Sequence, residues 1–228
     1  MNQVQRTIAA VSVLVLAASG APAQDRPGKG DDGGFKPMFD LPKFWIYNGA
    51  TARWAFTGDG VIVSEGGGGG WLMHPKEFGD LELRLEYRMT KGGNSGVTLR
   101  CPKQPPEGVS GNKAEPAFLA YEIQLVDDEN HADGKEALTC TGSIFGIVPA
   151  RKRNVSKPLG EWNDLRVVAR GTKVTVTLNG EAVQDADLKD FASKAKGKNP
   201  HLLNTKGHVG LQSWKGRVEF RNLRIKDL

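Results

Sequence analysis

Alternation of apolar and polar residues constrains the fold of this chain more than any other feature. In Leu81–Met89 (LELRLEYRM) every second residue is apolar, so apolar side chains face one side of a strand and charged ones the other. In the later run YEIQL, the same period places Glu122 and Gln124 together on the face opposite Ile123. A carboxylate beside an amide fits either a sugar-binding surface or a solvated one, and that choice decides the function.

Short strand-like runs separated by Gly, Pro, Asn or Asp fill most of the chain, and its 29 glycines among 228 residues fit many tight turns. Asn179-Gly180 between two alternating runs predicts a hairpin with a type I′ turn. A short surface helix is expected within 187–196, a flexible connection at Gly66–Gly70, and a surface turn at His74-Pro75. Many strands and few helices predict an all-β sandwich of two antiparallel sheets. The expected strands are Arg53–Phe56, Val61–Ser64, Leu81–Met89, Gly96–Arg100, Ala120–Val126, Ser143–Ile147, Leu165–Arg170, Lys173–Leu178, Glu181–Gln184, Val209–Ser213 and Val218–Ile225.

The N-terminus has the pattern of an export signal. Arg6 precedes the apolar run Ile8–Ala18, and Ala21-Pro22-Ala23 forms a small-residue cleavage site. We expect a signal peptide at 1–23, a flexible polar linker at 24–34 and one β-sandwich domain at 35–228. No segment is long and apolar enough for a transmembrane helix. The sequence therefore predicts a secreted or periplasmic protein, and N-terminal sequencing that begins at Gln24 checks it.

Charge and cysteine content narrow the partners and the compartment. Removal of Arg6 with the signal lowers the formal net charge from +5 to +4, too dilute a surplus to predict nucleic-acid binding. Export favours a disulfide between Cys101 and Cys140, which would close a loop of about 40 residues and stabilise the fold by roughly 4 kcal/mol. The alternative is two separate buried thiols.

A mixed polar surface is expected where several strands present their outward side chains. Alternation gives that surface a cation, a carboxylate, two amides, an imidazole and an indole, a mixture that suits a sugar. These side chains belong to Arg100, Glu122, Gln124, His208, Gln212 and Trp214. The alternatives are a structural ion pair of Glu122 with Arg100, a core position for Trp214 and a turn position for His208.

Six motifs, in order, resemble the 3-keto-disaccharide hydrolase family, formerly a domain of unknown function, over 38–228. They are GDLELRLEYR, GNSGVTLR, YEIQLVDD, TGSIFG, EWNDLRVVARGTKVTVTLNGE and GHVGLQSWKGRVEFRNLRIKDL. The resemblance implies a fold of the concanavalin A-like lectin and glucanase type, a jelly roll in which sugars lie across the concave face. It also implies secretion and action on glycosides oxidised at the 3-position.

Comparison with the glucanases of that fold argues against ordinary retaining hydrolysis. Their signature is Glu-x-Asp-x-x-Glu, whereas here the three positions are Glu122, Gln124 and Asp127. An amide replaces one acid, and in a regular strand Asp127 faces away from Glu122 unless a bulge intervenes. A retaining mechanism needs two carboxyl groups about 5–5.5 Å apart.

A 3-keto glycoside needs less catalytic machinery. The ketone acidifies the C2 proton, so one base can remove it; the enolate then expels the C1 oxygen and water adds back. We expect Glu122 or His131 as the base and Arg100, or a metal, as the group that stabilises the enolate. The residues expected to bind the substrate are Asn94, Ser95, Gln124, Asp127, His208, Gln212 and Trp214.

Two questions stay open from the sequence. The acidic loop from Asp127 to Asp133, with His131, is compatible with Ca²⁺ or Mn²⁺, or is a solvated turn. The chain is either a glycoside-processing enzyme or a carbohydrate-binding module without turnover, and an adhesion or scaffold domain is a third reading.

Overall fold

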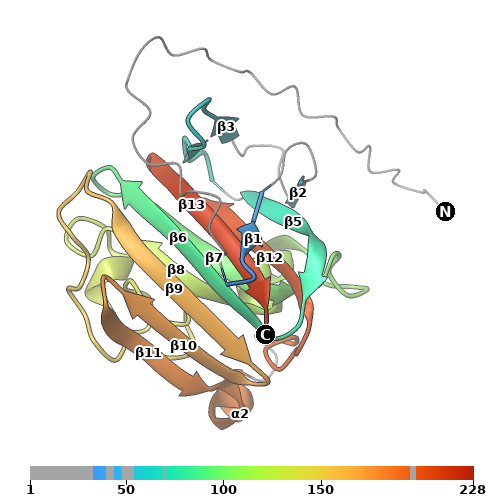
Figure 1. Ribbon diagram of the computed structural model, residues 1–228. Coiled ribbons are helices and arrows are strands. Elements are labelled where there is room, and N and C mark those ends of the chain that lie inside the picture. Colours follow the sequence, from blue (N-terminus) through green and yellow to red (C-terminus); the bar gives the residue numbers. More distant parts are fainter. Residues whose placement is uncertain (1–32, 40–43, 48–53, 69, 196–198) are drawn as a thin grey trace.

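Two antiparallel sheets hold most of the regular structure in the computed structural model, which describes residues 33–39, 44–47, 54–68, 70–195 and 199–228 (Figure 1). The smaller sheet has the order β2 (Trp45–Tyr47), β5 (Gly70–Phe78), β12 (Gly207–Ser213), β7 (Asn94–Cys101) and β8 (Tyr121–Val126). The larger has the order β11 (Glu181–Asp187), β10 (Lys173–Leu178), β9 (Asn163–Arg170), β6 (Leu81–Met89), β13 (Val218–Asp227), β4 (Ile62–Ser64) and β3 (Trp54–Phe56), with β1 (Lys36–Pro37) beside β13. The all-β, two-sheet prediction is confirmed. The predicted signal peptide and most of the predicted linker lie outside the described residues.

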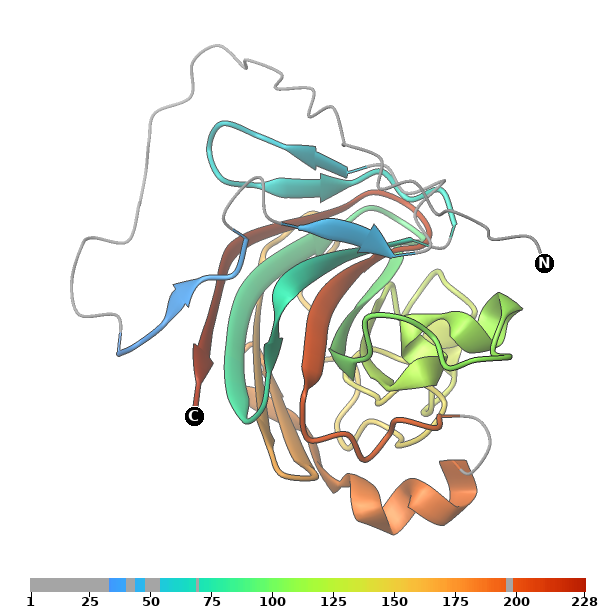
Figure 2. The ribbon, with the colours of Figure 1, turned by 90° about the vertical axis from the view of Figure 1, so that its right-hand side faces the viewer.

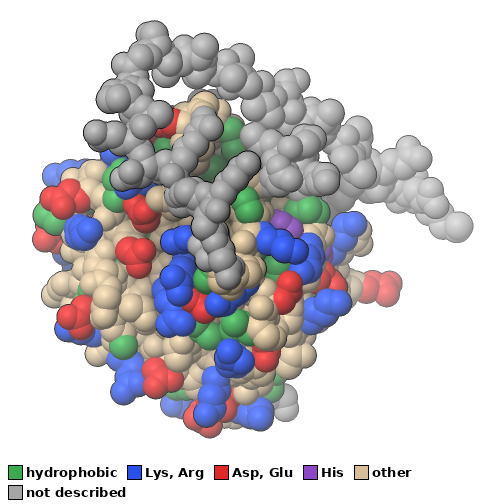
Figure 3. Space-filling view, viewed as in Figure 1, with side chains coloured by type: hydrophobic (Ala, Val, Ile, Leu, Met, Phe, Trp, Pro, Cys, Tyr) green, Lys and Arg blue, Asp and Glu red, His purple; other side chains and the backbone are tan. Residues whose placement is uncertain are grey.

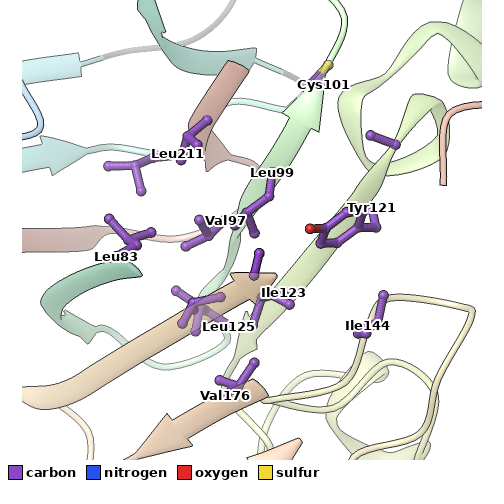
Figure 4. Close-up of a cluster of buried hydrophobic side chains, with 14 of the residues drawn as sticks. Leu83, Val97, Leu99, Cys101, Tyr121, Ile123, Leu125, Ile144, Val176 and Leu211 are labelled. Carbon is purple, nitrogen blue, oxygen red and sulfur yellow. The ribbon is translucent and has the colours of Figure 1, made fainter. Parts of the chain in front are cut away.

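The core forms where the apolar faces of the two sheets meet. Val97 and Ile123 of the smaller sheet pack in one cluster with Leu83 and Val176 of the larger one (Figure 4). All four side chains are fully buried. Burying each such side chain stabilises the fold by about 1.5–3 kcal/mol. The apolar side chains of these strands therefore face the core, as the alternation in the sequence predicted.

Both sheets curve the same way, and short helical segments lie on the concave side of the smaller sheet (Figure 2). The connection from β7 to β8 contributes a 3₁₀ turn, Gly111–Ala114, and the short helix α1 (Pro116–Leu119). The chain after β8 adds a second 3₁₀ turn, Asp133–Lys135. None of the helices in the described residues is long and apolar enough to cross a membrane.

Local signals predicted several elements closely. β6 and β10 have the predicted bounds, and Asn179 and Gly180 both have positive φ, as a type I′ turn requires. The predicted helix is a 3₁₀ turn, Leu188–Phe191, followed by α2 (Ala192–Ala195). The predicted strand Ser143–Ile147 is wrong. Only an isolated bridge joins Ile144 to β8, because the chain turns back at once through backbone bonds between Ile144 and Val148.

Strand β5 was not predicted, because its Pro75 suggested a turn. Proline lacks the N–H that a central strand needs. In the structure the pairing of β5 with β12 shifts register around Pro75, between Met73 opposite Gly210 and Glu77 opposite His208. The irregularity leaves Pro75 at a place where the ladder needs no donor.

The outer face of the larger sheet is covered by ion pairs. Glu82 accepts hydrogen bonds from Arg84 (2.8 Å) and Arg166 (2.7 Å), and Glu86 accepts one from Arg221 (2.8 Å). Acidic and basic side chains intermingle over this side of the molecule (Figure 3). The charged residues that alternate in β6 therefore belong to a solvated, charge-compensated face.

The predicted disulfide does not form, because the two cysteines lie at opposite ends of β8. Cys101 follows Leu99, which pairs with Tyr121 at the start of that strand. Cys140 precedes Thr141, whose hydroxyl donates to the carbonyl of Val126 at its end. A six-residue strand spans about 17 Å, whereas a disulfide needs Cα atoms within about 7 Å. Both cysteines are buried free thiols.

The expectation that Arg100 joins the polar face of the smaller sheet is also wrong. Its φ of +57° interrupts the alternation of β7, and its side chain is fully buried. The guanidinium donates to the carbonyl oxygens of Gly79 (3.3 Å), Asn204 (3.3 Å) and Gly171, and it pairs with Asp80 (3.2 Å). Arg100 thus joins three chain segments that meet at one end of the sandwich.

We predict that Arg100→Met lowers the free energy of unfolding by at least about 3 kcal/mol, because it leaves several buried carbonyl groups without donors. Urea denaturation measures the loss. Arg151→Met is the control, since Arg151 pairs with Asp185 in an exposed position and should change stability by less than about 1 kcal/mol. An Arg100 variant as stable as the wild type contradicts the structural role.

Candidate functional site

Glu122 and Gln124 lie on the concave face of the smaller sheet. Both belong to β8, where Glu122 pairs with Thr98 and Gln124 with Gly96 of β7. Residues opposite one another in antiparallel strands project to the same face, so all four share the face turned away from the core. Glu122 is nonetheless only 1% exposed. The carboxyl group is therefore enclosed outside the main hydrophobic core.

The absence of a side chain at Gly96 makes room for the Glu122 carboxyl group. A Cβ atom at position 96 would lie 1.8 Å from Glu122 Oε1 and 2.6 Å from its carboxyl carbon. No real Cβ atom tolerates such a contact, so the carboxyl group occupies the space above the β7 backbone. This close approach gives a physical reason for glycine in the motif Asn94-Ser95-Gly96.

Three buried polar atoms gather here without partners. Glu122 Oε1, Gln124 Nε2 and Ser143 Oγ form no hydrogen bond with any described residue. Ser143 lies beside Gln124, because its carbonyl oxygen accepts the Gln124 backbone N–H (3.1 Å). An unsatisfied buried polar group costs about 1–3 kcal/mol, and these three atoms therefore have hydrogen-bonding capacity left for a ligand.

The surroundings of Glu122 favour its protonated form. Burial raises the pKa of its carboxyl group well above the usual value, and the nearby acids Asp133 and Glu115 raise it further. Glu115 is held by the indole of Trp71, whose Nε1 donates to it (3.0 Å). A carboxyl group with a raised pKa can exchange protons with a substrate near neutral pH.

Asp133 connects His131 with the polar face. Asn94 Nδ2 donates to the Asp133 carboxylate (2.8 Å), and His131 Nδ1 lies 3.6 Å from the same oxygen. The Asp133 backbone N–H also donates to His131 Nδ1 (3.1 Å). A ring nitrogen that accepts a hydrogen bond carries no proton in the neutral imidazole, so Nε2 holds the proton and is the donor.

Several residues predicted for the site lie elsewhere. Arg100, the expected enolate-stabilising cation, is buried among turns as described above. Ser95 projects to the core side with Val97, and its hydroxyl donates to the Gln212 carbonyl oxygen (2.7 Å), so the contact with substrate predicted for it is wrong. His208 lies toward the other end of β12, where its Nδ1 faces the His74 carbonyl oxygen (3.0 Å) and its ring meets the edge of Trp45.

Asp127 organises the loop after β8. Its carboxylate accepts four hydrogen bonds, from the backbone N–H groups of Gly92, Glu129 and Asn130 and from the Asn130 side chain. Burial acts to raise its pKa, but these hydrogen bonds outweigh burial and hold the pKa below its usual value. The carboxylate is fully engaged within its own loop, so Asp127 does not join Glu122 as a second catalytic acid.

Gln212 lies near the end of β12, and Trp214 comes directly after that strand. Gln212 pairs with Trp71 of β5 and is partly exposed. Trp214 follows β12 and is 46% exposed, so it is not a core residue. An exposed indole beside a partly exposed amide is an arrangement that sugar rings contact readily.

Sequence reasoning missed three contributors to this site. Trp71 belongs to the unpredicted β5, and Glu115 lies in the connection between β7 and β8. Asp133 was considered only as a metal ligand. None of them shares a strand with Glu122, so period-two alternation carried no signal for them.

The acidic loop does not present a chelating set. The Asp127 carboxylate is occupied as described, Asp128 accepts the Thr141 N–H (2.9 Å), and Asp133 turns toward Asn94. Within the described part of the chain, no three His, Cys, Asp or Glu side chains converge as metal ligands do. These residues do not fit the Ca²⁺ or Mn²⁺ site that the sequence suggested.

Comparisons with known proteins place the chain in a sugar-processing context. The family described as 3-keto-alpha-glucoside-1,2-lyase-like domains matches residues 34–226. A 3-keto-disaccharide hydrolase of Bacteroides thetaiotaomicron is 32% identical over 210 residues, which cover 82% of this chain and 71% of that protein.

Solved structures agree with this match. Two provisionally assigned glycosyl hydrolases from Parabacteroides distasonis superpose with TM-scores of 0.65 and 0.69, at 28% and 25% identity. They cover 85% and 86% of this chain and 99% and 94% of their own. A carbohydrate-binding module from Bacillus subtilis, at 15% identity and a TM-score of 0.51, covers 85% of this chain and 96% of its own and shares the fold.

Glu122 and Glu82 are expected to change the stability of the protein with pH in opposite directions. The pKa of Glu122 is raised in the folded protein, so its contribution to stability is complete below the usual 4.5 and is lost as pH rises toward the folded value. Hydrogen bonds from Arg166 and Arg84 lower the pKa of Glu82 to about 2, so its contribution is present above 4.5 and is lost as pH falls toward 2.

We therefore expect Glu122→Gln to stabilise the protein increasingly above pH 5, by about 1–3 kcal/mol near pH 8. Glu82→Gln should destabilise it at neutral pH, with the difference shrinking toward pH 2. Denaturant unfolding across the pH range measures both. A Glu122→Gln variant that is less stable than the wild type at pH 8 would mean that the carboxyl group has a partner.

Proposed function

The chain belongs to the family of 3-keto-alpha-glucoside-1,2-lyase-like domains, and from that membership we propose that it cleaves 3-keto glycosides by elimination followed by hydration. The comparisons support a glycoside-hydrolase-like role. The observation that carries the finer proposal is the unpartnered pair on the concave face, the Glu122 carboxyl group and the Gln124 amide. One can move a proton and the other can donate a hydrogen bond to a developing oxyanion.

The two groups lie close enough to act on one sugar ring. Glu122 bends over Gly96, the residue opposite Gln124, so its carboxyl group and the Gln124 amide share one part of the concave face. The Glu122 carboxylate, the stronger base because its pKa is raised, removes the C2 proton of the 3-keto sugar. The electron pair moves into the C2–C3 bond, and Gln124 Nε2 donates to the C3 oxygen as negative charge develops.

Elimination then breaks the bond between C1 and the leaving oxygen, which takes up a proton as it departs. The Glu122 carboxyl group, which now carries the C2 proton, can pass a proton to this oxygen, and the His131 Nε2–H can donate a hydrogen bond to it, because Nδ1 is an acceptor. Water next adds to C1 while a proton returns to C2. The sum is one glycoside and one water converted to one 3-keto sugar and one alcohol, with no change in oxidation state.

A non-catalytic carbohydrate-binding module is the second candidate. The observations that favour it are the enclosure of Glu122 and the exposure of Trp214 near the partly exposed Gln212. A binding face needs only such surface groups, whereas catalysis requires the substrate to reach the enclosed carboxyl group.

The deciding experiment incubates the purified protein with 3-keto-trehalose or a 3-keto-β-glucoside, with and without EDTA, and follows release of 3-ketoglucose. We expect release by the wild type and at least a hundredfold lower turnover by Glu122→Gln, the range in which general acid–base groups contribute. No release from either substrate, with glycan binding intact, selects the binding module. A Glu122→Gln variant with full turnover contradicts the assigned base, and EDTA sensitivity adds a metal to the mechanism.

A matched pair of glycine variants tests the position of the carboxyl group without changing it. Gly96→Ala should displace Glu122 and lower turnover in a protein whose circular dichroism spectrum is unchanged. Gly58→Ala is the control, because a Cβ atom there meets nothing within 4 Å. Equal turnover in both variants contradicts the proposed seat of the carboxyl group.

A further inference from the structure

Two phenylalanine rings from different segments of the chain meet beside β8. Phe118 belongs to α1, which leads into β8, and Phe145 belongs to the segment that runs along the outer edge of that strand. The ring centroids lie 6.0 Å apart and the ring planes are inclined at 68°, an edge-to-face contact. Both side chains are partly exposed, so apolar surface is accessible to a ligand here.

Backbone pairing places Phe145 beside Glu122. The Phe145 N–H donates to the Glu122 carbonyl oxygen (2.9 Å), and the preceding residue, Ile144, forms a bridge with Ile123. Ile144 is fully buried and faces the core together with Ile123 (Figure 4). Neighbouring residues of a paired segment project to opposite faces, so Phe145 lies on the concave face next to the Glu122 side chain.

The backbone that carries Phe118 is fixed by the rest of the fold. The Leu119 carbonyl oxygen accepts the His201 N–H (2.8 Å), and the Ala117 carbonyl oxygen accepts a hydrogen bond from the Asn199 side chain (2.8 Å). Ala117 and Leu119 are buried, whereas Phe118 between them is partly exposed. A ring presented by such a held segment is preorganised, which limits the entropy lost when a ligand binds.

Further apolar surface adjoins the aromatic pair. The Gly146 N–H donates to the Leu138 carbonyl oxygen (2.8 Å), so the chain at Leu138 lies next to the residue that follows Phe145. The Leu138 side chain is 44% exposed, and a Cβ atom at Gly146 would meet nothing within 4 Å. Apolar side chains that gather at a surface mark binding sites, whereas isolated ones are ordinary.

The proposed reaction indicates which part of the substrate comes near these rings. Glu122 acts on C2, and C1, which carries the leaving group, is bonded to C2. Since C3 faces Gln124, the leaving group lies on the side of Glu122 away from Gln124, and along β8 that side leads to α1 and Phe118. Asp133 and Glu115 lie near enough to act on Glu122, so they disfavour an anionic leaving group.

We propose that Phe118 and Phe145 form the leaving-group subsite, and that it selects glycosides with a neutral aromatic aglycone. This inference rests on the proposed cleavage of 3-keto glycosides, because that reaction defines the leaving group. The two rings determine specificity by contact with the aglycone and take no part in proton transfer.

Two substrates whose leaving alcohols have similar acidity isolate this contact, benzyl 3-keto-β-glucoside and methyl 3-keto-β-glucoside. The wild type should have a kcat/KM about tenfold or more higher for the benzyl glycoside, because the phenyl ring is buried in the transition state. Phe118→Ala should lower the kcat/KM for the benzyl glycoside at least about threefold and leave that for the methyl glycoside unchanged. Phe118→Leu, which keeps apolar contact with the core, should act in the same direction with a smaller effect.

Phe191→Ala is the matched control. Phe191 is another partly exposed phenylalanine packed against the core, but it lies in the 3₁₀ turn Leu188–Phe191, after β11. This variant should leave the kcat/KM values of both glycosides unchanged.

Nuclear magnetic resonance titration of the ¹⁵N-labelled protein with unoxidised benzyl β-D-glucoside reads the subsite without turnover, since elimination needs the C3 ketone. We expect the amide signals of Phe118, Phe145 and Gly146 to shift saturably, and methyl β-D-glucoside at the same concentration to leave them in place. These shifts in a protein that cleaves neither 3-keto glycoside would reject the proposed reaction and retain the apolar subsite.

Three results would overturn the subsite itself. Equal kcat/KM for the two glycosides, in an active wild type, would remove aromatic selection and leave the reaction standing. An equal loss for both glycosides in Phe118→Ala would give the ring a structural role alone. Loss of the benzyl preference in Trp214→Leu but not in Phe118→Ala would place the leaving group near the end of β12.

Discussion

The close approach of the Glu122 carboxyl group to the backbone of Gly96 is the contact on which the concave face depends. A single additional carbon at position 96 would occupy the space of the carboxyl oxygen. The carboxyl group gains its enclosure there, and with it a raised pKa, but it gains no hydrogen-bond partner among the described residues. The neighbouring Gln124 amide nitrogen is also buried without a partner among the described residues. The fold therefore holds an acid and a hydrogen-bond donor side by side, and one ligand could bind both.

The polar residues that alternate along β6 and those that alternate along β8 have different surroundings in the structure. In β6 the charged residues meet arginines from neighbouring strands, so Glu82 is ionised and paired. In β8 Glu122 meets Gly96 on one side, and the acids that influence it come from distant loops. The sequence predicted both sets of polar residues and the two-sheet fold, because an alternation of period two is a local property. It did not show which set faces solvent and which forms a site, because that depends on the residues packed opposite each strand.

Most of the wrong predictions from the sequence concern residues whose positions depend on distant parts of the chain. The positive φ of Arg100 turns its side chain to the end of the sandwich, and no residue pattern announces that angle. The cysteines each flank a strand, but the order of strands in the sheet separates them by the length of β8. Ser95 was assigned by its motif rather than by its parity, which places it with Val97 on the core side. Asp133 reaches the site through a loop, where alternation has no meaning.

The most direct test of the account follows the C2 hydrogen of a 3-keto glycoside during cleavage in D₂O. Elimination and hydration break the C2–H bond, so the 3-ketoglucose first released should carry deuterium at C2, above the level in free 3-ketoglucose incubated with the same protein. Mass spectrometry at early times measures the difference. Product that retains its C2 hydrogen would mean that the glycosidic bond breaks by direct displacement, and that Glu122 does not act as a base at C2.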